Sequence, residues 1–359
     1  MRVAFAIENQ LGHRTLLSNL KSALAQEHSI DPVWIPLDPT GDSILERIPH
    51  VRDKHALIFG LKVRKLLREA ETRGTFDACF MHTQRMAHLS VDRMRRLPTF
   101  LSIDATPEQF DAFYRRGLKG LPSERGSFYW KVRDGIHRRT YGTARGVVTM
   151  SNAVAASLMS TYRMDPANVL VLWPGVDTAK WQPPAVRAQG EECRILFVGG
   201  DFERKGGELL LRWAKETTRR DFRIDIVTEK PLAPVPRVTV HTKIAPNDPS
   251  LVELVQQADL FVQPTRADMS SWAISEAKAA GTAVISTHVG GIPELVRHGI
   301  DGWLIRPGDY AAFSEHLESA LSNRQILSDF GRRAREDALD RFDSISNVRK
   351  LVAFMNEHI

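Results

Sequence analysis

The chain has 359 residues, which is too long for one ordinary hydrophobic core and favours two domains of comparable size. Hydrophobic residues make up 43% of it and charged residues 26%, a composition that excludes disordered and fibrous proteins. No run approaches the ~20 apolar residues that cross a bilayer, and the N-terminal segment lacks the features of a signal peptide. The two cysteines, Cys79 and Cys193, lie in apolar runs, so we expect buried thiols in a cytoplasmic protein.

The net charge of +6 is concentrated in one segment of the chain. Residues 93–145 hold twelve Lys and Arg against five Asp and Glu, which leaves the remainder close to neutral. Such a segment fits an anionic partner, whether nucleic acid, anionic lipid or a phosphorylated substrate. A solvated surface without a partner also explains it, and charge alone favours that interpretation.

The first half of the chain alternates short apolar runs with amphipathic segments, the pattern of a parallel sheet with helices between its strands. Strands are predicted at residues 3–7, 30–37 (interrupted by Pro32), 78–81, 100–103, 146–150 and 169–172. Helices are predicted from 16 to 24, over 54–72 and after Ser151-Asn152, which is expected to form the N-cap of the helix that follows it.

The alternation stops and then starts again in the second half. Residues 182–190 contain Pro, Gln and Gly, which predicts a linker or a long surface loop. Strands are then predicted at 194–198, 222–227, 238–241, 260–263, 283–286 and 302–305, and helices near 207–217, 250–257, 271–280, 309–321 and 344–357. Two such sets predict an α/β protein with two Rossmann-like domains, whose parallel sheets face each other across a ligand-binding cleft.

The most informative segment runs from Pro264 to Ala277, where an apolar strand leads into a polar loop and then a helix. Ser270 or Ser271 is expected to cap that helix, whose first N–H groups and positive dipole end suit a diphosphate. Asp268 and Glu276 are eight positions apart and can accept hydrogen bonds from vicinal hydroxyls of a ribose or a sugar. By spacing alone, the two acids are better explained as a cap-region residue and a surface residue.

Neighbouring motifs change that interpretation. The two acids are followed by AKAAGTAVI at 277–285, GGIPELV at 290–296 and DGWLI at 301–305. They are preceded by VLWPGVD at 171–177 and FVGGDFERKGG at 197–207. In this order the motifs closely resemble those of the family 4 retaining glycosyltransferases, specifically over about 170–310 and more loosely over 1–150.

The resemblance implies a GT-B fold and transfer of a hexose-type sugar, with retention of anomeric configuration, from a nucleotide diphosphate-sugar to a glycan or lipid-linked acceptor. The nucleotide-sugar is a substrate, and no cofactor is implied. An N-terminal acceptor domain over 1–177 and a C-terminal donor domain over 191–340 are expected. The last segment, 341–359, would cross back to the N-terminal domain, as in that family, and its apolar residues at helical spacing need a partner surface.

Carried over by position, Lys205 neutralises the donor phosphates and Glu276 accepts hydrogen bonds from the ribose. Asp268 stands near the transferred sugar, where the family usually has Glu. The backbone N–H groups of the helix start contribute to the same donor site, and these belong to Ser270, Ser271 and Trp272.

Glycines and basic residues complete the implied donor site. Gly12 matches the glycine loop after the first strand, where a side chain would obstruct the diphosphate. Gly200 stands where the family often has Arg, and Arg204 is the candidate for the missing charge. Ser270-Ser271 also departs from the family, because it replaces a usual Phe-Gly pair.

Departure of a nucleoside diphosphate builds negative charge on phosphate oxygens, which fixed cations and N–H dipoles stabilise. The chain contains no Asp-x-Asp pair and no His with ligand-like spacing, so a metal-independent site is predicted. Asp104 follows the strand at 100–103 and is expected to contact the acceptor or the reacting sugar, although an Asx-turn before Pro107 explains it as well. His82 follows another strand, where a structural role is favoured.

Three other functions compete with this one. A nicotinamide-dependent oxidoreductase is disfavoured because the chain contains no Gly-x-Gly. A nucleic-acid-binding function is disfavoured because the chain has no recognised motif for it. A non-catalytic nucleotide-sugar or carbohydrate-binding protein on the same fold stays open as an alternative.

The aromatic run at 128–130 lies beside Lys131 and Arg133. Such a segment suits an anionic surface at the inner face of the membrane. Burial of those rings in the core is the alternative.

Overall fold

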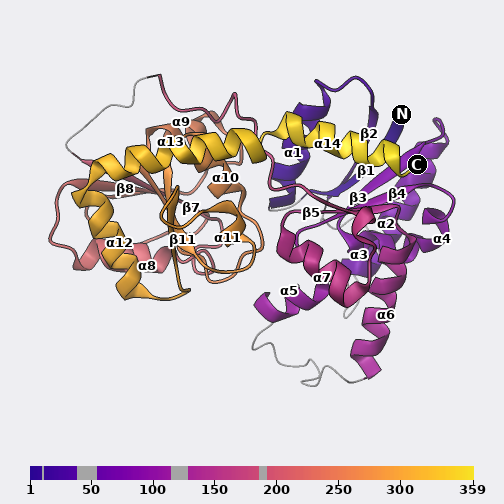
Figure 1. The fold of residues 1–359 in the computed structure, drawn as a ribbon, viewed down its shortest axis with the longest axis horizontal. Helices are drawn as coiled ribbons and strands as arrows, with labels where there is room; N and C mark the ends of the chain where they lie inside the picture. The colour runs from indigo at the N-terminus through magenta and orange to yellow at the C-terminus, as the bar shows by residue number, and fades with distance from the viewer. Residues whose placement is uncertain (10–11, 39–54, 115–127, 186–191) are drawn as a thin grey trace. The chain divides into compact units, whose positions relative to one another are not determined.

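A computed structural model describes residues 1–9, 12–38, 55–114, 128–185 and 192–359 (Figure 1). They form two compact units, of which one comprises Met1–Leu172 with Ile345–Ile359 and the other Trp173–Ser344. The greater part of the predicted linker, residues 186–190, lies outside the described residues. Within the described ranges, no helix combines the length and the apolar character needed to cross a bilayer.

The first unit contains a six-stranded parallel sheet with the order β2-β1-β3-β4-β5-β6. Its strands are β1 (Arg2–Glu8), β2 (Asp31–Leu37), β3 (Ala78–His82), β4 (Thr99–Ile103), β5 (Gly146–Thr149) and β6 (Val169–Val171). All six predicted strands are confirmed. The strand with Pro32 lies at the edge of the sheet, where a proline removes the fewest ladder hydrogen bonds.

Helices connect the strands of the first sheet. They are α1 (Gly12–Leu24), α2 (His55–Glu71), α3 (Gln84–Ala87), α4 (Val91–Met94), α5 (Pro107–Tyr114), α6 (Phe128–Thr143) and α7 (Asn152–Tyr162). The Ser151 cap of α7 is confirmed, because its hydroxyl accepts a hydrogen bond from the Val154 N–H at 3.3 Å. Neither α5 nor α6 was predicted, since charged and aromatic residues interrupt any regular apolar stripe there.

The last helix, α14 (Ser344–Glu357), belongs to the core of the first unit (Figure 1). Val348, Leu351 and Met355 are buried in one cluster with Phe5 of β1 and Phe100 of β4. The predicted helix at 344–357 is confirmed, and the first sheet supplies the surface that its apolar face requires.

Met355→Ala is expected to lower the free energy of unfolding by about 2–5 kcal/mol, because it removes a fully buried side chain and leaves a cavity. Urea unfolding measures the effect. Lys350→Ala is the control, since Lys350 lies exposed on the same helix and its loss should change stability by no more than about 0.5 kcal/mol. Equal unfolding midpoints for the two variants would show that α14 contributes nothing to the core.

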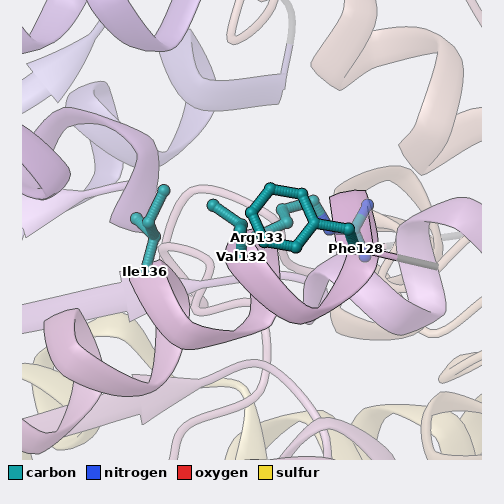
Figure 2. A pocket seen from close by; sticks show the side chains of 4 residues that line it. All are labelled: Phe128, Val132, Arg133 and Ile136. Atoms are coloured by element: carbon teal, nitrogen blue, oxygen red, sulfur yellow. The ribbon is translucent and has the colours of Figure 1, made fainter. Parts of the chain in front are cut away.

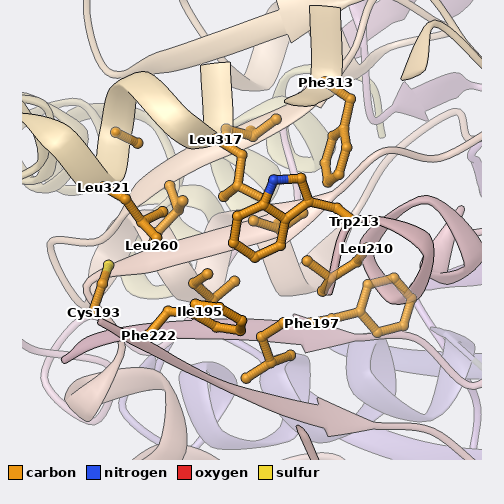
Figure 3. Packing of buried hydrophobic residues seen from close by; sticks show 14 of the residues in the cluster. Cys193, Ile195, Phe197, Leu210, Trp213, Phe222, Leu260, Phe313, Leu317 and Leu321 are labelled. Atoms are coloured by element: carbon orange, nitrogen blue, oxygen red, sulfur yellow. The ribbon is translucent and has the colours of Figure 1, made fainter. Parts of the chain in front are cut away.

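The second unit contains another six-stranded parallel sheet, with the order β12-β11-β10-β7-β8-β9. Its strands are β7 (Cys193–Val198), β8 (Phe222–Val227), β9 (Val238–His241), β10 (Leu260–Gln263), β11 (Ala283–Thr287) and β12 (Gly302–Ile305), as predicted. Trp213, Phe313 and Leu317 pack against this sheet in the main core cluster (Figure 3). Both cysteines are buried and unpaired, as expected.

The helices of the second unit are α8 (Gly207–Glu216), α9 (Pro249–Gln257), α10 (Trp272–Ala279), α11 (Ile292–Leu295), α12 (Tyr310–Ser322) and α13 (Arg324–Arg341). No helix is predicted over α13, because its many charged residues obscure an apolar stripe. An ionic contact anchors it, because the fully buried Lys278 of α10 forms ion pairs with Asp337 of α13 and with Asp301. An apolar pattern cannot reveal an anchor of this kind.

Each sheet has a point at which the strand order reverses. In the first sheet it lies between β1 and β3, and in the second between β7 and β10. The loops after such a pair of strands diverge to opposite faces, and ligands bind there, beyond the carboxyl ends of the strands. The loops that follow β7 and β10 contain six of the donor-site residues expected from the sequence, which are Gly200, Arg204, Lys205, Asp268, Ser270 and Ser271.

Candidate active site

The loop after β7 and the loop after β10 are bound to each other by hydrogen bonds. The Thr265 hydroxyl donates to the carbonyl oxygen of Arg204 at 3.1 Å, and the Arg204 guanidinium donates to the carbonyl oxygen of Ala267 at 2.9 Å. Gly206 has a φ of +80°, and a Cβ there would lie 2.0 Å from the carbonyl oxygen of Pro264. Only glycine permits this approach of the two backbones.

Lys205 and Asp268, which are 63 positions apart in the chain, form an ion pair at the junction of these loops. The Lys205 side chain is 14% exposed and that of Asp268 is 7% exposed, so the pair is largely shielded from water. The structure thus brings together two residues that the sequence assigned to one donor site. An anion that approaches Lys205 has to share its ammonium group with Asp268.

Arg204 is directed differently from its neighbour Lys205. Its Nε donates to the Asp201 carboxylate at 2.9 Å, in addition to the contact with Ala267, so the guanidinium braces the two loops. Gly200 is exposed, and a Cβ on it would have nothing closer than the Glu229 carboxyl group at 3.9 Å. The backbone of Gly200 therefore borders open space.

Ser271 occupies the N-cap position of α10, but its hydroxyl does not cap the helix. The hydroxyl donates instead to the side-chain oxygen of Gln263 at 2.7 Å, and the Gln263 amide donates to the carbonyl oxygen of Val198 at 2.7 Å. The predicted side-chain cap is thus wrong for Ser271. Gln263 is a fully buried link between β7, β10 and α10 that sequence reasoning missed, and its place at the end of a strand was the available signal.

Glu276 lies within α10 and is only 5% exposed, so it is not a surface helix residue. Burial raises the pKa of its carboxyl group from 4.5 to about 7, and the nearby positive charge of Lys180 acts in the opposite direction. Burial disfavours the ionised form because it removes water from the charge. Near neutral pH the carboxyl group can therefore exist in either state, and a ligand that donates hydrogen bonds would favour the ionised one.

The remaining predicted residues lie at the carboxyl ends of strands in the first unit. Gly12 is exposed at the start of α1, and Asp104 follows β4 without a hydrogen bond from any described residue. The Asx-turn alternative is not observed, because Thr106 and Gln109 exchange hydrogen bonds at the start of α5. His82 ends β3, and burial lowers its pKa well below the ordinary value, which fits a neutral structural histidine.

Two family models match successive parts of the chain. The model described as Glycosyltransferase Family 4 matches residues 13–180, and the model described as Glycosyl transferases group 1 matches residues 192–323. The chain belongs to glycosyltransferase family 4. The glycosyltransferase activity expected from the sequence is confirmed at this general level.

Relatives of this family 4 glycosyltransferase support the assignment. It is 25% identical over 292 residues to the D-inositol 3-phosphate glycosyltransferase of Pseudarthrobacter chlorophenolicus, a match covering 75% of this chain and 68% of that protein. Sucrose-phosphate synthase from Thermosynechococcus elongatus has a similar structure, with a TM-score of 0.77, 16% identity and coverage of 99% and 98% of the two chains. HepE of Anabaena, solved in complex with UDP, also has a similar structure, with a TM-score of 0.69 and 14% identity. That match covers 99% of this chain and 100% of HepE. The GT-B fold class is thus confirmed.

Proposed function

We propose that this protein is a retaining glycosyltransferase that moves a hexose-type sugar from a nucleotide diphosphate-sugar to a glycan or lipid-linked acceptor. The observation that carries the proposal is the ion pair between Lys205 and Asp268, held by two interlocked loops directly before α10. The donor binds to the second unit and the acceptor to the first. HepE, which shares the fold, was solved with UDP, and this supports a nucleotide diphosphate-sugar as the donor.

Each part of the donor has a partner in the second unit, and Gly12 of the first unit is the one addition to this set. The Lys205 ammonium group and the backbone N–H groups at the start of α10, those of Ser270, Ser271 and Trp272, meet the diphosphate. The ionised Glu276 accepts hydrogen bonds from the ribose hydroxyls. Asp268 faces the transferred sugar, and the glycine positions, Gly200 and Gly12, let the diphosphate approach the backbone.

Transfer breaks the bond between the anomeric carbon and a phosphate oxygen. The acceptor oxygen forms the new bond on the same face of the sugar, and its proton passes to the leaving phosphate. Negative charge grows on the diphosphate as the bond lengthens, so Lys205 and the N–H dipoles stabilise the transition state more than the bound donor. Asp104 in the first unit positions the acceptor or the reacting sugar, and no residue serves as a covalent nucleophile.

Proton NMR during the reaction tests the proposal. The first-formed product should carry its anomeric proton in the configuration of the donor, and the donor signal should decline. An inverted product would overturn retention. A donor that binds but is never consumed would establish the alternative, a non-catalytic nucleotide-sugar or carbohydrate-binding protein on this fold.

EDTA should leave the activity unchanged, since the proposed site neutralises phosphate with Lys205 and N–H dipoles. Among the described residues, no group of three His, Cys, Asp or Glu side chains is arranged to hold a metal ion. The measurement is turnover in excess EDTA, compared with turnover in the presence of added Mg²⁺ or Mn²⁺. Strict dependence on either ion would refute metal independence.

A peripheral position at the cytoplasmic face of the membrane is the second part of the proposal. Phe128, Val132 and Ile136 lie exposed along α6, where they line a groove of about 350 Å³ with Arg133 (Figure 2). Arg139 follows Ile136 by three positions and is exposed on the same face. Lys131, which directly precedes Val132, is exposed as well. Trp130, in contrast, is buried, so the core alternative holds for that ring. An apolar stripe with flanking cations suits an anionic bilayer surface.

Sedimentation with vesicles tests this surface. The protein should sediment with anionic vesicles but not with neutral ones, and high salt should release it because salt screens the attraction. Neutralising Arg138 and Arg139 should weaken binding, as should neutralising Arg115 and Arg116, which lie outside the described residues. Equal recovery in the supernatant with both vesicle types would leave a protein that acts on a soluble acceptor.

A further inference from the structure

Glu294 lies in the short helix α11, within the GGIPELV segment at 290–296. Its carboxylate accepts a hydrogen bond from the indole N–H of Trp173 at 3.2 Å, and its carbonyl oxygen accepts one from the Arg341 guanidinium at 2.8 Å. The same guanidinium group lies over the Trp173 ring, 5.0 Å from the ring centre. The three residues therefore form one cluster, although Glu294 is 121 and 47 positions from the other two.

Two members of this cluster lie near the ends of the second unit. Trp173 is the first residue of that unit, and Arg341 is the last residue of α13, the helix next to its other end. The Val176 N–H donates to the carbonyl oxygen of Phe342 at 2.7 Å, so the two ends are hydrogen-bonded to each other. The cluster thus attaches Glu294 to the segments by which the chain enters and leaves the second unit.

The start of the same segment contacts the backbone of Asp268. Gly290 has a φ of +56°, and a Cβ there would lie 1.9 Å from the carbonyl oxygen of Asp268. The preceding loop is bound as well, because the Thr287 hydroxyl donates to the carbonyl oxygen of Thr265 at 2.6 Å. No side chain fits between the two backbones at Gly290, and only three residues separate Gly290 from Glu294. The place of Asp268 therefore depends on the place of α11.

We propose that Glu294 is a positioning residue of the donor site, which is anchored by Trp173 and fixes, through α11, the orientation of Asp268 toward the transferred sugar. This inference rests on the proposed function, because it assigns that sugar to Asp268. Free nucleoside diphosphate lacks the sugar and is proposed to be bound by Lys205 and Glu276. Loss of the anchor should therefore impair the sugar-bearing donor and leave the free nucleotide nearly unaffected.

Two substitutions that each remove the indole hydrogen bond test the inference in the full-length protein. Trp173→Phe and Glu294→Leu should each lower kcat/KM roughly 3- to 30-fold, with whichever UDP-, GDP- or ADP-sugar the wild type uses. Calorimetry should show a change of less than about twofold in the affinity for the matching free nucleoside diphosphate. The double variant should be no worse than the worse single variant, because both changes remove one contact. Glu294→Gln should keep most of the activity, since its amide oxygen still accepts the indole hydrogen bond.

Glu318→Leu is the matched control, because Glu318 accepts a hydrogen bond from the indole N–H of Trp213 at 2.9 Å in the same unit. That contact joins α8 to α12 and does not involve α11. The control should unfold at a lower urea concentration than the wild type but keep its kcat/KM and its affinity for the nucleotide.

Three results would overturn the inference: equal losses for the donor and the free nucleotide, a double variant whose losses add, or wild-type kcat/KM in both single variants. If Glu294→Leu does not fold, Trp173→Phe decides the question. A wild type that binds none of UDP, GDP and ADP would refute the proposed function instead.

Discussion

Lys205→Ala is expected to lower the turnover of the donor by roughly 30- to 1000-fold, which corresponds to ~2–4 kcal/mol of lost transition-state stabilisation. Lys205 supplies the side-chain cation that meets the diphosphate as its charge develops. Arg204 cannot replace it, because the Arg204 guanidinium is bound to Asp201 and to the carbonyl oxygen of Ala267. The measurement is kcat with a saturating donor, on protein whose fold has been checked by circular dichroism.

The ion pair with Asp268 complicates this variant, since loss of Lys205 leaves a buried carboxylate without its partner. Asp268→Asn separates the loss of the ion pair from the loss of the lysine. It releases Lys205 from the carboxylate, so free nucleoside diphosphate should bind at least as tightly as to the wild type. The sugar-bearing donor should bind less well, because Asp268 is proposed to face the transferred sugar. Lys215→Ala, on the exposed last turn of α8, is the control for loss of a lysine. Full turnover by folded Lys205→Ala would exclude the assigned role.

Glu276→Gln is expected to weaken binding of the intact donor and of free nucleoside diphosphate together, by roughly 10- to 100-fold, because both share the ribose. The substitution keeps the shape of the side chain and removes its charge. The affinity of the wild type should rise as the pH increases through about 7, where the buried carboxyl group ionises. Titration of the nucleotide itself affects both proteins equally, so the difference between their pH profiles isolates Glu276.

The stability of the wild-type fold, unlike its affinity for the nucleotide, should fall as the pH rises. The carboxyl group has a pKa of about 7 in the folded protein and an ordinary value of 4.5, so between these values the folded state holds the proton more firmly. The free energy of unfolding contributed by protonated Glu276 is present below 4.5 and is lost as the pH rises to about 7. In urea unfolding, the free energy of unfolding of Glu276→Gln should therefore increase relative to that of the wild type between pH 5 and pH 8. A constant difference between the two proteins would show that Glu276 does not titrate in this range.

The strands could be predicted because each is a short buried apolar run, and this signal is local. The site was only partly predictable for the opposite reason. Motif order identified Lys205, Asp268 and Glu276, but not the ion pair between the first two, which depends on two loops 63 positions apart meeting at one edge of the sheet. The burial of Glu276 could not be read from its spacing either, because it depends on what packs over α10.

Residues that act without a motif escaped prediction. Lys278 looks like a surface lysine in the sequence, yet it is fully buried between Asp301 and Asp337 and fastens α13 to α10. Ser271 has the residue type of a helix cap, but Gln263, eight positions earlier, takes its hydroxyl as a hydrogen-bond donor.

Release of nucleoside diphosphate from a panel of UDP-, GDP- and ADP-sugars is the most direct test of the central claim, that the second unit binds a nucleotide-sugar and activates it for transfer. The account predicts release from at least one of these donors by the wild type, and loss of that release in Lys205→Ala and Glu276→Gln. Lys215→Ala should match the wild type. Binding of the nucleotides without release from any sugar donor, or release that persists in both site variants, would contradict the account.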